Sequence, residues 1–175
     1  MLYYHLIGAI ASAYKPGVYV ELGLHVGDTF REVQPHARCL YGIDIVQNPQ
    51  LESFRRFSNV NIHYCTTDTF FDNFTGKIDM AFIDADHCFQ SAKRDFDNVL
   101  ARLNPGGVIL LHDTDPENDS LFSSDRCGDA YRIVSILEDH SELNVVTLPI
   151  SNTGLSIVTR KNETRTHLRH LLSKA

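Results

Sequence analysis

The chain has 175 residues, of which 43% are hydrophobic, and a net charge of −6. This length suits one domain with a sizeable core, and the hydrophobic share excludes a disordered chain. The negative charge argues against a nucleic-acid binder, which usually carries a basic surface, and no apolar run is long enough to span a membrane. The four cysteines are widely spaced and form no C-x-x-C pair, which suits reduced thiols, so we expect a cytoplasmic protein.

The predicted elements begin with a helix in the N-terminal segment 1–15, where apolar residues follow helical spacing. No Lys or Arg precedes this apolar stretch, which argues against a signal peptide. From there, short β-rich runs alternate with amphipathic stretches. The predicted strands are residues 17–23, 39–46, 60–65, 77–84, 108–113, 143–149 and 155–160. The predicted helices that follow the N-terminal one are residues 28–36, 49–57, 89–103 and 128–140.

Repeated alternation of strand and helix predicts an α/β fold with a mostly parallel sheet and helices on both faces. The loop at 151–154 fits a hairpin that places one antiparallel strand in the sheet. Because no linker interrupts the pattern, we expect a single domain over residues 1–175. The long acidic stretch 113–129 could be a lid or a solvated loop. The C-terminal Arg165, Arg169 and Lys174 fit a solvated terminal helix.

Polar and ionisable residues gather where the predicted parallel strands end. Ligands of an open α/β sheet bind beyond the carboxyl ends of its strands. In chain order, these ends carry Glu21, Gly23 and Gly27; Asp44; Thr66, Thr67 and Asp68; Asp84, Asp86 and His87; and His112, Asp113 and Thr114. Acids are common at any one strand end, but five such ends at one edge favour a binding site.

The glycine loop after the first strand, E-L-G-L-H-V-G, narrows the choice of ligand. It lacks the G-x-G-x-x-G pattern that lets a helix approach a pyrophosphate. Glu21 near this loop would repel a phosphate and would suit a cationic ligand. Asp44, at the end of the second strand, could accept both hydroxyls of a ribose. S-adenosylmethionine has a ribose and a positive charge but no phosphate, so it fits this pattern.

The chain resembles the class I S-adenosylmethionine-dependent methyltransferases from about Pro16 to Arg160. The likeness is strongest to small bacterial methyltransferase domains related to macrocin and catechol-type O-methyltransferases. It implies O-methylation of a small molecule and a Rossmann-like, doubly wound sheet of seven strands with the last antiparallel. The segments that carry the resemblance are VELGLHVGDT, YGIDI, FIDADHCFQSAKRDFDNVLARLNPGGVILLHDT and LSIVTR.

The resemblance also implies roles for individual residues. The methionine part of the cofactor would be held by Glu21, Gly23 and Gly27, with Thr29 as a donor to its carboxylate. The ribose would lie on Asp44, and the adenine beside Ile45 and near Thr67 and Asp68. Asp84 and Asp86 would lie where cofactor and methyl acceptor meet.

A divalent metal is a further implication of the resemblance. In catechol-type relatives, the acid that ends the fourth strand binds magnesium with an Asp-Asn pair that ends the fifth. Here that pair is Asp113-Thr114, preceded by His112. Asp84 and Asp113 could hold Mg²⁺, and with His112 a softer transition metal. Asp84 is a catalytic candidate in either case, and without a metal His87 is the candidate general base.

Three alternatives remain open. The first is a nicotinamide-dependent oxidoreductase, the second a non-catalytic cofactor-binding or scaffold protein. The third is a metal-dependent sugar or antibiotic tailoring enzyme of related fold. Because only about fourteen residues precede the first strand, little material is available to cover an acceptor. A second subunit of a homodimer, or the 113–129 segment, could complete the acceptor site.

Overall fold

The computed structural model describes residues 2–161. The predicted terminal helix with Arg165, Arg169 and Lys174 therefore lies outside the described residues. Within residues 2–161, no helix is long and apolar enough to cross a membrane.

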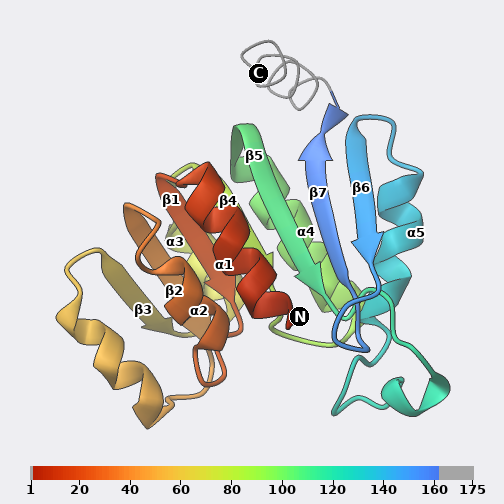
Figure 1. Cartoon of the computed structure of the whole chain (residues 1–175), viewed down its shortest axis with the longest axis horizontal. Coiled ribbons are helices and arrows are strands. Elements are labelled where there is room, and N and C mark those ends of the chain that lie inside the picture. The colour runs from red at the N-terminus through yellow and green to blue at the C-terminus, as the bar shows by residue number, and fades with distance from the viewer. Residues whose placement is uncertain (1, 162–175) are drawn as a thin grey trace.

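A seven-stranded sheet forms the centre of the molecule (Figure 1). The strand order is β3-β2-β1-β4-β5-β7-β6, and β7 runs antiparallel to both of its neighbours. This confirms the predicted Rossmann-like α/β fold with its antiparallel last strand. The strands are β1 Val18–Leu22, β2 Cys39–Asp44, β3 Val60–Tyr64, β4 Ile78–Ile83, β5 Leu103–His112, β6 Leu143–Leu148 and β7 Leu155–Arg160. The order reverses between β1 and β4, and ligands of such sheets bind at that switch point.

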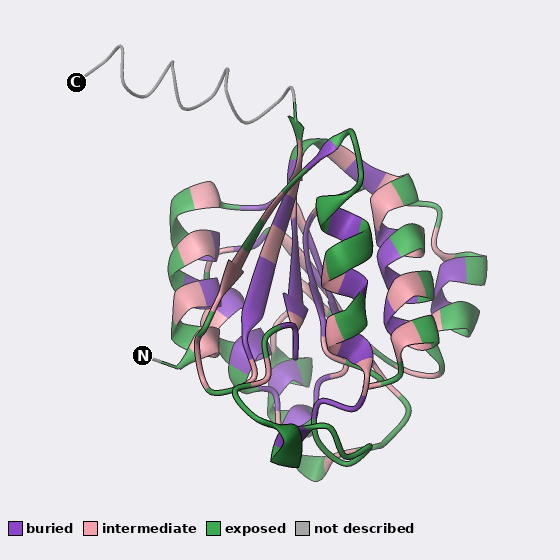
Figure 2. Ribbon diagram, turned by 90° about the vertical axis from the view of Figure 1, so that its right-hand side faces the viewer, coloured by how far each residue is buried: buried purple, intermediate pink, exposed green. Residues whose placement is uncertain are grey.

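Helices cover both faces of the sheet, and each layer closes its own apolar core (Figure 2). On one face lie α3 (Thr67–Asn73), α4 (Phe89–Arg102) and α5 (Ile133–Glu138). On the other face lie α1 (Tyr3–Tyr14), α2 (Asp28–Val33) and the 3₁₀ helix η1 (Pro49–Arg56). Two short 3₁₀ helices, η2 (Asp119–Leu121) and η3 (Ala130–Arg132), lie before α5.

The elements differ from the sequence prediction in several places. The predicted helix 128–140 is the 3₁₀ helix η3 followed by α5, which has six residues, and the predicted helix 28–36 ends at Val33. Helix α3 was not predicted; the Thr66 side chain caps it by accepting from the Thr69 backbone N–H, and Phe70 and Phe71 bury its inner face. The segment after Pro49 is a 3₁₀ helix rather than an α-helix. Strand β5 begins at Leu103 instead of residue 108, because Leu103 pairs with Ile78 of β4 before the ladder shifts register.

Candidate active site

A cavity of about 920 Å³ opens at the carboxyl ends of the parallel strands. Its walls come from the ends of β1 to β5, the first half of α4, the segment after β5, and Tyr3 of α1. This volume lies in the upper part of the range typical of ligand pockets. The cavity therefore has room for a nucleoside-sized cofactor and a small second ligand.

Most of the predicted site residues line this cavity, but three do not. Those that line it are Gly23, Asp44, Ile45, Thr67, Asp68, Asp84, Asp86, His87, His112 and Asp113. Glu21 is 1% exposed and accepts a hydrogen bond from the Tyr19 hydroxyl at 2.5 Å. Thr29 is buried on α2, and Gly27 precedes that helix with a positive φ of 80°. None of these three residues is part of the cavity wall.

Gly23 brings the ends of β1 and β4 together. It has a φ of 85°, and a β-carbon there would overlap the backbone of Asp84 and Ala85. Only glycine allows both this conformation and this close approach without strain. The close approach of Gly23 therefore helps to fix the position of Asp84 in the cavity wall.

Asp44, at the end of β2, lines one side of the cavity and orders the backbone around it. Its carboxylate accepts hydrogen bonds from the backbone N–H groups of Leu24 and His25, at 2.9 and 3.0 Å, and of Val46, at 2.8 Å. A carboxylate has about four lone-pair sites, so Asp44 can accept a further donor. Beside it, Ile45 and Val46 are 74% and 63% exposed and form an apolar surface at the cavity. A ribose on Asp44 and a planar base on these two side chains match this arrangement.

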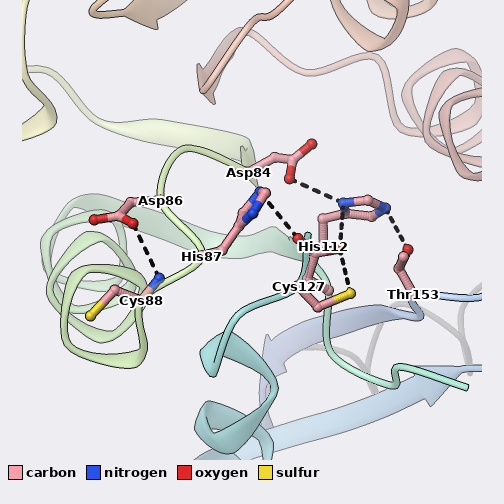
Figure 3. A network of polar contacts seen from close by, with 8 residues as sticks. Asp84, Asp86, His87, Cys88, His112, Cys127 and Thr153 are labelled. Atoms are coloured by element: carbon pink, nitrogen blue, oxygen red, sulfur yellow. Dashed lines mark hydrogen bonds and ion pairs between the residues drawn. The ribbon is translucent and has the colours of Figure 1, made fainter. Parts of the chain in front are cut away.

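The other half of the cavity holds a network of acids and imidazoles (Figure 3). His112 lies between two carboxylates, with Nδ1 3.0 Å from Asp84 Oδ1 and 3.1 Å from Asp113 Oδ1. Its Nε2 is 2.9 Å from Thr153 Oγ1. His87 Nε2 is 3.3 Å from Asp113 Oδ2. Nδ1 of His112 faces two carboxyl groups, which favours the tautomer with a proton on Nδ1.

Burial and charge shift the pKa values in this network. Burial alone would lower the pKa of His112, but the charges of Asp84 and Asp113 and the hydrogen bond to Asp84 outweigh it and raise that pKa. Burial raises the pKa of Asp113, and the charge of Asp84 adds to the effect while His112 opposes it. Burial also raises the pKa of Glu21 well above its usual range. The two acids therefore favour the protonated form of His112.

Within the described residues, Asp84, His87 and Asp113 form a group that could hold a metal ion. One ligand atom from each lies within 4.8 Å of the others. Two carboxylates and an imidazole suit a divalent metal such as Mn²⁺ or Zn²⁺, so the donor set fits. The sequence offered His112 as a further ligand; its two ring nitrogens face Asp84, Asp113 and Thr153, while the imidazole in this group is that of His87.

The 113–129 segment borders this network and is tied to it at several points. The Cys127 thiol donates to Asp113 Oδ1 at 3.4 Å. The backbone N–H groups of Asp129 and Ala130 donate to the His87 carbonyl, and Asp129 Oδ1 accepts from the Phe89 N–H at 2.6 Å. The backbone position of His87 therefore depends on the far end of this segment.

Some cavity residues were not predicted from the sequence. Tyr3 reaches the site from α1, with its ring centroid 4.1 Å from that of His112. Ser91, Arg94 and Asp95 enter from α4. A signal for Asp95 was present, because it falls on the buried stripe of that helix beside Ala92, Phe96 and Val99. No sequence pattern pointed to Tyr3.

Comparisons with known proteins give a family and a fold. The sequence model of a family described as "Methyltransferase domain" matches residues 20–114, more than half of the chain. No curated protein matches the chain significantly. Many solved structures share its fold.

Three of the similar structures show which kinds of methyltransferase share this fold. An O-methyltransferase from Bacillus cereus in complex with SAH has a TM-score of 0.73 and 14% identity, over 91% of this chain and 80% of that one. The O-methyltransferase TomG from Streptomyces achromogenes, in complex with SAM and involved in tomaymycin synthesis, has a TM-score of 0.71 and 15% identity, over 91% and 80%. An rRNA methylase from Streptococcus thermophilus has a TM-score of 0.68 and 12% identity, over 89% and 95%. At such low identities, these likenesses establish the fold.

Proposed function

Since this chain belongs to the methyltransferase-domain family, we propose that it transfers the methyl group of S-adenosylmethionine to an oxygen atom of a small molecule. The family membership agrees with the resemblance predicted from the sequence and disfavours the nicotinamide alternative. Two of the structures with the same fold are O-methyltransferases bound to SAH or SAM. The single observation that carries the proposal is the cavity, which is lined by Asp44, Ile45 and Val46 as well as by an acid–imidazole network.

The charge of the cavity favours a small acceptor over a nucleic acid. Its lining includes two arginines, Arg94 and Arg126, and seven aspartates: Asp44, Asp68, Asp84, Asp86, Asp95, Asp113 and Asp125. These aspartates would repel the phosphate backbone of a nucleic acid, because sites that bind nucleic acids are basic. Although an rRNA methylase shares the fold, the local charge supports a different acceptor here.

The chemistry requires little beyond positioning and one proton acceptor. The acceptor oxygen forms a bond to the methyl carbon as the carbon–sulfur bond breaks, so a fixed, in-line approach supplies much of the rate. The acceptor hydroxyl must lose its proton. In one tautomer of His87, the Nε2–H group donates to Asp113. The other ring nitrogen, Nδ1, can then accept the proton of the acceptor hydroxyl. Asp113 thus orients the base and stabilises the imidazolium that forms.

A metal-assisted reaction is the second candidate mechanism. Asp84, His87 and Asp113 would hold the ion, which would lower the pKa of the acceptor hydroxyl when bound. A protonated His112 beside both carboxylates would oppose a second cation, so we expect weak metal binding. Labelled S-adenosylmethionine with a panel of hydroxylated small molecules tests the two routes. Full turnover in EDTA supports His87 as base, and loss that Mn²⁺ or Mg²⁺ restores supports the metal.

Titration calorimetry tests the cofactor. S-adenosylmethionine and S-adenosylhomocysteine should bind and NAD should not. Asp44→Ala should weaken binding by about 1–3 kcal/mol, the scale for losing hydrogen bonds to a charged group. Asp97→Ala is the matched control, because Asp97 lies on the exposed side of α4 and pairs with Lys93. Binding of NAD alone would reject the proposal, and cofactor binding without turnover of any acceptor would support the non-catalytic alternative.

A further inference from the structure

The buried carboxyl group of Asp95 lines the cavity without a full set of partners. Asp95 is 2% exposed, and its Oδ1 atom is buried and has no hydrogen-bond partner among the described residues. The Thr67 side chain is a hydrogen-bond partner of the Asp95 carboxyl, and Arg94 is a neighbouring positive charge. A buried carboxylate oxygen without a donor costs free energy, and a ligand that brings a donor would recover it.

The surroundings of Asp95 match a planar base. Thr67 lies at the start of α3, which packs against β2, and α4 lies beside α3. Thr67 and the first half of α4 line the cavity together with the exposed Ile45 and Val46. The acid–imidazole network lies on the β5 side. A ring that packs on Ile45 and Val46 would therefore present its edge to α3 and α4, away from the reacting atoms.

Asp68, the acid that the sequence placed near the adenine, is less suited to read that edge. Its side chain is 51% exposed, and its Oδ1 is 2.9 Å from Arg94 Nε. The charge of Asp68 is therefore already paired and solvated. Asp95 has the opposite character, because it is buried and has an acceptor atom without a donor.

We propose that Asp95 recognises the adenine of the cofactor by accepting a hydrogen bond from its exocyclic 6-amino group. This inference rests on the proposed function, because it concerns the base of the S-adenosylmethionine placed in this cavity. It also makes Asp95 a specificity residue. A base with a carbonyl oxygen at that position would face the carboxylate with acceptor against acceptor, while an amide at residue 95 would offer that oxygen a donor.

A change of ligand and residue together tests the assignment. The ligands are S-adenosylhomocysteine and its 6-oxo analogue S-inosylhomocysteine, titrated by calorimetry at pH 8, where a carboxyl with a pKa of about 6 is ionised. The proteins are the wild type, Asp95→Asn and the matched control Asp68→Asn. Circular dichroism verifies that each is folded.

The wild type should prefer the amino ligand by about 100-fold, within the scale for leaving a buried hydrogen-bonding group without its partner. Asp95→Asn should reduce this preference at least tenfold, by weakening the amino ligand and strengthening the oxo ligand, while Asp68→Asn keeps the wild-type ratio. An unchanged ratio in Asp95→Asn, or a collapsed ratio in Asp68→Asn, overturns the inference and leaves the proposed function intact. If the wild type binds neither ligand, both fall together.

Discussion

Replacing Asp95 by asparagine should make the protein more stable at neutral pH. Burial raises the pKa of this carboxyl from 3.8 to about 6, with the Thr67 hydrogen bond and the charge of Arg94 opposing the shift. The folded chain therefore holds a proton that the unfolded chain has released, so stability falls as pH rises from about 4 to about 6. The difference of roughly two pKa units corresponds to about 3 kcal/mol as an upper bound. Asparagine has nearly the same shape and no charge, and it avoids this cost.

Urea denaturation followed by circular dichroism measures the effect. At pH 7.5 the Asp95→Asn variant should exceed the wild type by about 1–3 kcal/mol in unfolding free energy. At pH 4 the gap should shrink, because the wild-type carboxyl is then mostly protonated in the folded state. Asp97→Asn is the control on the same helix; it loses an exposed pair with Lys93 and should gain nothing. A variant that is less stable than the wild type at pH 7.5, or a gap that does not depend on pH, would refute the reasoning.

Three further predictions concern the backbone around the site. Gly23→Ala should lower the melting temperature by more than Gly106→Ala does, and it should abolish cofactor binding in calorimetry. Both glycines have a positive φ, but only a β-carbon at residue 23 would meet backbone atoms. Equal losses of melting temperature in the two variants would contradict this. Asp129→Ala should reduce turnover about tenfold or more, because it releases the N-terminus of α4 and shifts His87. Asp129→Asn keeps a hydrogen-bond acceptor and should remain active. If both variants lose the same turnover, the effect belongs to the charge of Asp129. Hydrogen exchange of residues 115–127 should slow when cofactor and acceptor bind, and strong protection in the empty protein would mean a structural loop.

The fold could be predicted because its signals are local. Each central strand is a short apolar run, and each long helix has a stripe of buried residues, as Phe96 and Val99 show in α4. Helix α3 escaped prediction because it has only seven residues and lies directly after a strand. Two adjacent phenylalanines in so short a segment, Phe70 and Phe71, do not distinguish a helix from a strand.

The candidate site could be predicted at the strand ends but not at its sides. Topology alone brings Asp44, Asp84 and Asp113 to one edge, because parallel strands end together. The direction of Glu21 follows from strand alternation, which puts it on the same face as Tyr19, beneath the helices. The approach of Tyr3 to His112 depends on how α1 packs, and no local pattern encodes that contact.

The carboxylate of Asp95 is expected to affect both the free energy of unfolding and the binding of the ligand. In a helix stripe that otherwise buries Ala92, Phe96 and Val99, an apolar side chain or an amide would stabilise the folded state better than an acid. An acid with an unpartnered oxygen is therefore a local violation of packing rules, and such violations concentrate where a ligand supplies the missing partner. The two Asp95→Asn measurements have opposite expected signs. A gain in unfolding free energy together with a loss of base discrimination would mean that the carboxylate is present for the ligand. If Asp95→Asn gains stability and still prefers the amino ligand over the oxo ligand as strongly as the wild type, the buried carboxylate has no role in binding the base.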